Sequence, residues 1–218
     1  MYFNNNQTSQ LNDLIEKIEQ RTGIELVAAV VGKCDTYPEI PWKAFALAVA
    51  VSALGWQVLS IVKPDWNLAW IEQYVVVFIL GVGAALTLLS IYWPAFGRLF
   101  LDRIRAEAEI GQYARAFFLE RELFRTRART GILLLVSLFE RRVVILPDSG
   151  VAGRLEQKAL RGVINQMIPH LRRNDRFQAL LRGLSALETE LQKAGFGPVK
   201  KTDDELKDEL IEQKGVDR

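Results

Sequence analysis

Two long apolar segments without charge constrain this chain more than any other feature of its sequence. Residues 44–62 and 74–93 contain no Asp, Glu, Lys or Arg. Each reaches the roughly 20 residues that an α-helix needs to cross a hydrocarbon core about 30 Å thick. A soluble-core helix of this length would normally show a polar stripe, and neither segment has one. The pattern predicts two transmembrane helices.

The connection between these segments, residues 63–73, is short, so the helices are expected to be antiparallel neighbours in a hairpin. Small residues four apart allow two helices to approach closely. They predict a contact between the Ala46–Ala50 and Gly81–Ala85 faces. The spans contain no charged side chain, which favours a membrane anchor over a transporter or channel subunit.

Basic residues indicate the orientation of the hairpin, because cytoplasmic flanks carry an excess of Lys and Arg. The connection contributes Lys63 alone, whereas the outer flanks carry Lys33, Lys43, Arg98, Arg103 and Arg105. The first ten residues lack the basic and apolar regions of a cleavable signal peptide. We therefore expect a plasma-membrane protein that spans the bilayer twice, with both termini cytoplasmic.

The remaining sequence predicts a soluble domain that the hairpin interrupts. Apolar spacing predicts helices and strands in this order: helix 9–22, strand 24–31, helix 96–124 with a break at Gly111, strands 131–138 and 143–146, and two amphipathic helices within 153–195. Strands 24–31 and 131–138 are apolar on both faces, as in sheets covered on both sides. The connection between them is long, so we expect them to be parallel.

The predicted fold class is α/β: a small three-layer sandwich with a short mixed sheet, interrupted by a two-helix transmembrane hairpin. The expected divisions are a first part of the domain (1–40), the hairpin (41–95), a second part (96–197) and a charged mobile tail (198–218).

This order of elements resembles the TPM domain family (phosphatase-like and YgcG-type proteins), in particular its membrane-associated bacterial branch with an inserted hairpin. The resemblance rests on residues 15–31, 127–151 and 153–195. It implies an α/β/α sandwich, a bacterial inner-membrane location, and roles in phosphate-ester hydrolysis, Ca²⁺ or Mg²⁺ binding, or maintenance of membrane complexes. It also implies partners among membrane proteins, including the LemA type. Family members with proposed acidic sites often have an acidic residue before the second strand, and this chain has Arg129-Thr-Gly131 there.

The turn Asp148-Ser149-Gly150 is the candidate ligand site, because a strand-to-helix turn directs backbone N–H groups at an anion. The same residues suit a helix cap, and both interpretations stay open. The single histidine, His170, lies at the far end of the next predicted helix from Ser149, so no catalytic residue is predicted. Asp148 is the one carboxylate that falls on an acidic loop of the family, and a single carboxylate is a poor Ca²⁺ site. Whether a metal binds here, and which one, is left unknown.

Six arginines near the second strand form the candidate basic surface: Arg121, Arg125, Arg127, Arg129, Arg141 and Arg142. They suit either a solvated surface or one that faces anionic lipid or an acidic partner. The formal net charge of +2 argues against a nucleic-acid partner. The lone cysteine, Cys34, excludes an intrachain disulfide and is expected to be structural.

The sequence therefore predicts a membrane-anchored TPM-like domain that acts as an interaction or maintenance factor for membrane proteins, as a monomer or an oligomer. The alternative is a weak hydrolase of phosphate esters.

Overall fold

A computed structural model describes residues 2–63, 69–198 and 210–216, without the side chains of residues 69–73. The chain divides into two compact units: Met1–Asp35 with Ala106–Arg218, and Thr36–Arg105. We call them the α/β unit and the hairpin unit. The hairpin unit contains α2 (Glu39–Val62), α3 (Ala69–Tyr92), α4 (Pro94–Gly97) and η2 (Arg98–Phe100). The α/β unit contains α1 (Asn5–Thr22), β1 (Glu25–Val31), η3 (Leu123–Arg125), β2 (Gly131–Ser137), β3 (Arg142–Pro147), α6 (Ser149–Ala152), α7 (Gln157–Arg172), α8 (Arg176–Lys193), β4 (Ile211–Gln213) and most of α5 (Arg103–Glu120).

The described residues form one mixed sheet in the order β3-β2-β1-β4. Strand β1 pairs in parallel with β2, from Glu25 opposite Gly131 to Val31 opposite Ser137, as the sequence predicts. Strand β3 is antiparallel to β2. Every residue of β1 and β2 is buried, because both strands are central and covered on both faces.

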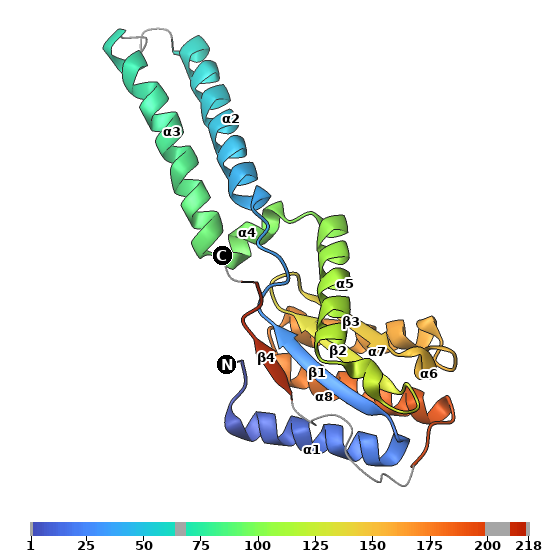
Figure 1. Cartoon of the computed structure of the whole chain (residues 1–218). Coiled ribbons are helices and arrows are strands. Elements are labelled where there is room, and N and C mark those ends of the chain that lie inside the picture. The colour runs from blue at the N-terminus through green and yellow to red at the C-terminus, as the bar shows by residue number, and fades with distance from the viewer. Residues whose placement is uncertain (1, 64–68, 199–209, 217–218) are drawn as a thin grey trace. The chain divides into compact units, whose positions relative to one another are not determined.

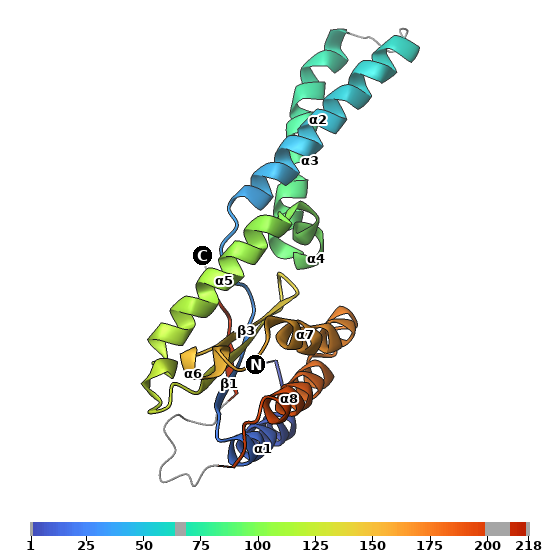
Figure 2. The ribbon, with the colours of Figure 1, turned by 90° about the vertical axis from the view of Figure 1, so that its right-hand side faces the viewer.

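Alternate side chains of β1 enter two separate cores, which makes the fold a three-layer sandwich (Figures 1 and 2). Leu26, Ala28 and Val30 pack with apolar side chains of α1, α7 and α8. Val27, Ala29 and Val31 pack on the other face against α5. The predicted α/β fold class with a short mixed sheet is therefore confirmed.

Two helix boundaries differ from the prediction. Helix α1 begins earlier than residue 9, because Asn4 caps it: the Asn4 side chain accepts a hydrogen bond from Gln7 N and the Gln7 side chain accepts one from Asn4 N. Helix α5 runs through Gly111 without a break. It begins instead where the Asp102 carboxylate accepts hydrogen bonds from the N–H groups of Ile104 and Arg105.

The prediction of a mobile tail over 198–218 is wrong for the part that the structure describes. Residues Ile211–Gln213 form β4, which lies parallel to β1 at the edge of the sheet. Leu210 is buried, and its N–H donates to the Asn12 side chain on α1. The backbone of the β1 edge provides hydrogen-bonding partners for this short segment.

The hairpin unit consists of two antiparallel helices that pack along each other, each long and apolar enough to cross a membrane. Their contact differs from the predicted one: Gly81 and Ala85 are exposed, and Gly83 is buried. A Cβ atom at Gly83 would lie 2.8 Å from Phe45 Cε2 and 2.9 Å from Val49 Cγ2. The small-residue rule therefore holds, but it acts on a neighbouring face of each helix.

Candidate functional site

The carboxyl ends of β1 and β2 lie side by side, which is where open α/β sheets usually bind ligands. Three side chains gather there: Cys34 after β1, Ser137 at the end of β2, and Glu140 in the following turn. The Glu140 carboxylate accepts hydrogen bonds from the Ser137 hydroxyl and, at 2.9 Å, from Cys34 N. All three residues are buried. We call this group the Glu140 clasp, because it joins the ends of the two parallel strands.

The clasp makes Cys34 a poor nucleophile. Burial raises the pKa of the Cys34 thiol to about 12, and the negative charge of Glu140 adds to this rise. Reactive cysteines depend on thiolate, which an environment of this kind suppresses at neutral pH. The structural interpretation of Cys34 is therefore supported by its surroundings. Sequence reasoning missed the clasp; the available signal was a serine and a glutamate three residues apart around the β2–β3 turn.

Strand β4 covers the edge of β1 beside the clasp. The Gly32 N–H donates to Gln213 O at 3.0 Å, and the Val216 N–H donates to Lys33 O at 3.1 Å. The Tyr113 hydroxyl of α5 donates to the Gln213 side chain at 2.8 Å. Gly32 is required here, because a Cβ atom would lie 2.5 Å from the Lys214 carbonyl oxygen. The C-terminal segment therefore closes over the carboxyl end of the sheet.

The predicted ligand turn, Asp148-Ser149-Gly150, caps a single-turn helix. Asp148 Oδ1 accepts a hydrogen bond from Ser149 N at 2.7 Å, and Asp148 Oδ2 lies 3.5 Å from Arg129 Nε. The Gly150 N–H donates to Arg129 O at 3.0 Å, and a Cβ atom at Gly150 would lie 2.3 Å from Ala128 O. The capping interpretation thus accounts for the contacts present, and ligand binding at this turn stays a prediction.

The residues at this turn do not fit a Ca²⁺ or Mg²⁺ ion. The buried Asp148 carboxylate already faces a guanidinium group. Nowhere in the described part of the chain do three His, Cys, Asp or Glu side chains gather as a metal site. A Ca²⁺ ion requires six to eight oxygen ligands.

The six predicted basic residues do not form one surface. Arg121, Arg125, Arg127 and Arg129 precede β2, whereas Arg141 and Arg142 follow it. The two groups are separated by the length of a seven-residue strand, roughly 23 Å at 3.3 Å per residue. Several of these side chains have local contacts: Arg125 pairs with Glu122, and Arg121 lies over the Phe117 ring.

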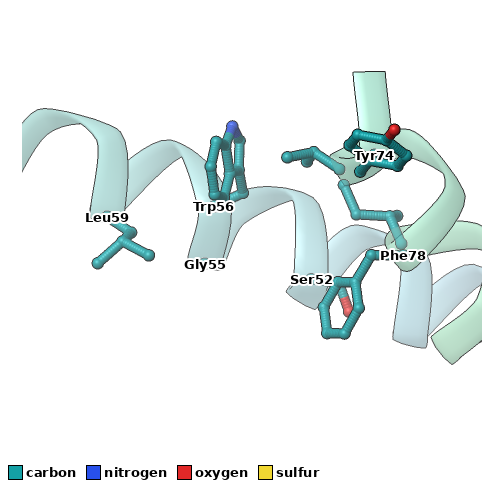
Figure 3. A pocket seen from close by; sticks show the side chains of 8 residues that line it. Ser52, Gly55, Trp56, Leu59, Tyr74 and Phe78 are labelled. Atoms are coloured by element: carbon teal, nitrogen blue, oxygen red, sulfur yellow. The ribbon is translucent and has the colours of Figure 1, made fainter. Parts of the chain in front are cut away.

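The hairpin unit contains an apolar groove between α2 and α3, near their connection (Figure 3). Its volume is about 470 Å³. Gly55 leaves space on α2, and the Trp56, Tyr74 and Phe78 rings lie around it. Its lining contains no charged side chain. Such a groove can accept an apolar chain.

The fold therefore defines a class: an α/β/α domain with an inserted pair of apolar helices. The family model of the TPM domain matches residues 99–190. The NMR structure of the BA42 protein from the psychrophilic bacterium Bizionia argentinensis has a similar fold, with a TM-score of 0.58 and 13% identity over 97% of this chain and 96% of that chain. No curated protein matches the sequence. Residues 99–190 therefore match the TPM domain, which agrees with the resemblance drawn from the sequence.

Proposed function

We propose that this protein is a membrane-anchored TPM domain that acts as an interaction or maintenance factor for other membrane proteins. The observation that carries the proposal is the surface of the hairpin unit. Large apolar side chains such as Val51, Ile61, Val77 and Phe78 are exposed around α2 and α3. Contiguous apolar surface of this kind marks membrane or protein contacts, since its exposure to water costs about 25 cal/mol per Å².

The dimensions of the helices agree with a bilayer. Helices α2 and α3 have 24 residues each, or about 36 Å at 1.5 Å per residue. That length exceeds a hydrocarbon core of about 30 Å. The excess of basic residues on the outer flanks supports an orientation with both termini in the cytoplasm. The two candidate spans and the family resemblance support an inner (plasma) membrane location with two spans.

The interaction role is supported by the carboxyl end of the sheet. The polar groups there are used within the domain: Glu140 binds Ser137 and Cys34, and Gln213 accepts from Tyr113. We infer that the domain presents a surface to a partner rather than a reacting group. The resemblance points to membrane proteins as partners, the LemA type among them.

Membrane extraction and cysteine labelling test this proposal. The protein should stay in the membrane fraction after alkaline carbonate treatment. A membrane-impermeant maleimide should label the Lys63→Cys variant in intact cells. It should label the Ser185→Cys variant only after the cells are lysed. The buried Cys34 provides a low background in both variants. Carbonate release would refute anchoring, and the reverse labelling pattern would refute the orientation. Crosslinking in native membranes that captured no membrane protein would refute the interaction role.

The alternative is a weak phosphate-ester hydrolase. It rests on the family and on Asp148, which lies within the matched segment. Purified protein should then hydrolyse p-nitrophenyl phosphate with Mg²⁺ or Ca²⁺, and Asp148→Ala should abolish this activity. Activity unchanged in Asp148→Ala would exclude the turn as the site.

A further inference from the structure

A short segment after α3 has a surface that the anchor alone does not explain. We call residues 93–104 the elbow. Helix α3 ends at Tyr92, and α4 and η2 follow before Asp102 caps α5. The elbow changes the direction of the chain at the end of an apolar helix.

Contacts within the hairpin unit hold the elbow in a defined conformation. The Gly97 N–H donates to Trp93 O at 3.1 Å, and a Cβ atom at Gly97 would lie 2.7 Å from Ser90 O. The Lys43 ammonium of α2 donates to Phe100 O at 3.3 Å. The elbow is therefore packed against the ends of both apolar helices.

The elbow exposes two large apolar side chains. Leu99 and Ile104 are 76% and 82% exposed, and Tyr92 and Trp93 at the end of α3 are also exposed. Each buried Leu or Ile side chain typically contributes about 1.5–3 kcal/mol, so these positions favour a non-aqueous environment. Aromatic rings at the end of a span are typical of the membrane–water interface.

The charged side chains near the elbow indicate which non-aqueous environment it suits. Four basic side chains (Lys43, Arg98, Arg103 and Arg105) and two acidic ones (Glu39 and Asp102) lie at this end of the hairpin. Glu39 pairs with Arg105 at 2.9 Å, and Asp102 is used as the α5 cap. Lys43 and Arg103 are exposed. Apolar side chains beside exposed basic ones are the combination that binds anionic membrane surfaces.

We propose that the elbow is an interfacial segment that buries Leu99 and Ile104 at the headgroup–acyl boundary and binds anionic phospholipid headgroups through Lys43 and Arg103. This inference rests on the proposed membrane anchoring. Its occupant is the bilayer, because the elbow continues directly from an apolar helix whose end would lie at headgroup depth. The elbow would fix how deeply the hairpin sits and would favour membranes rich in anionic lipid.

The test uses the full-length protein in nanodiscs of phosphatidylcholine with increasing phosphatidylglycerol. An environment-sensitive NBD probe is attached to the Leu99→Cys or Ile104→Cys variant, and acrylamide quenching reports exposure to water. Phe78→Cys is the control within a span. Leu119→Cys is the matched control for an exposed aliphatic residue of the α/β unit. The buried Cys34 should not react.

The elbow probes should show blue-shifted emission and protection from acrylamide, whereas the Leu119→Cys probe should stay quenchable. Elbow probes as accessible as Leu119→Cys, with Phe78→Cys protected, would overturn the inference and leave the anchor intact. An accessible Phe78→Cys probe would overturn the anchor itself, and the elbow proposal with it.

The headgroup part of the proposal has its own test. Binding of phosphatidylglycerol to the detergent-solubilised protein is measured by native mass spectrometry. The Lys43→Gln and Arg103→Gln substitutions should each weaken it about fivefold, the effect typical of one basic residue near a membrane surface. Lys158→Gln, which removes an exposed lysine of α7, should leave it unchanged. Equal binding by all variants would overturn the assignment of Lys43 and Arg103.

Discussion

The buried thiol of Cys34 should make the free energy of unfolding of the α/β unit fall at alkaline pH. The Cys34→Ser substitution should remove this contribution. In the folded protein the pKa of Cys34 is about 12, raised from an ordinary value of 9.0 by burial and then by Glu140. Between these values the unfolded chain loses this proton while the folded protein keeps it. Stability from this group is therefore complete below pH 9 and falls as the pH rises towards 12. One proton corresponds to a slope of about 1.4 kcal/mol per pH unit.

Cys34→Ser is the matched variant, because its hydroxyl has a similar size and does not titrate in this range. Urea unfolding of the full-length protein in detergent micelles, followed by circular dichroism, gives the free energy of unfolding at pH 8, 9 and 10.5. Relative to Cys34→Ser, the wild type should lose about 2 kcal/mol between pH 9 and 10.5. Titrations of lysine side chains occur in both proteins and cancel. Burial, and next the Cys34 charge, raise the Tyr113 pKa, so a Tyr113→Phe background removes that coupling.

Parallel loss of stability in wild type and Cys34→Ser would refute the raised pKa. Rapid maleimide labelling of Cys34 in the folded protein at pH 8 would refute it independently, since labelling needs an accessible thiolate.

Three further predictions concern single substitutions, two of which have a matched control position. Gly183→Ala should lower the free energy of unfolding, measured by urea titration, by about 1–3 kcal/mol relative to Gly162→Ala. A Cβ atom at Gly183 would lie 2.5 Å from the buried sulfur of Met167, whereas nothing lies within 4 Å of a Cβ atom at Gly162. Equal values would show that the core adapts. Gly83→Leu should separate α2 from α3, and Gly81→Leu should not, as reported by disulfide crosslinking between cysteines placed on the two helices. Asp148→Ala should reduce the thermal midpoint by a few degrees, since a lost cap costs about 1 kcal/mol; an unchanged midpoint would contradict the capping role.

The parts of this fold that the sequence predicts are those with a strong local pattern. Strands 24–31 and 131–138 are continuously apolar, and their parallel pairing follows from the long connection between them. Strand β4 could not be predicted, because Ile211–Gln213 has only three residues, two of them polar, and the open edge of β1 determines its conformation.

The candidate site, too, could be predicted only where it has a strong local pattern in the sequence. The Asp148 turn is visible as a strand-to-helix motif, but its partner Arg129 is brought to it by the fold. The sequence does not identify Glu140 either, because a glutamate in a turn usually lies in solvent, and here the ends of two strands enclose it. In the hairpin, small residues occur on more than one face of each helix, so packing decides that Gly83 makes the contact.

The insertion of the hairpin unit within the sheet also affects how the protein is made. About 100 residues separate the end of β1 from the start of its partner β2. At roughly 5–20 residues per second, the ribosome needs about 5–20 seconds to produce β2 after β1. Helices form within microseconds, so the hairpin helices can fold long before the sheet exists. During this interval the apolar β1 strand lacks its neighbour, so its apolar surface stays unpaired for seconds until translation supplies the second half of the domain.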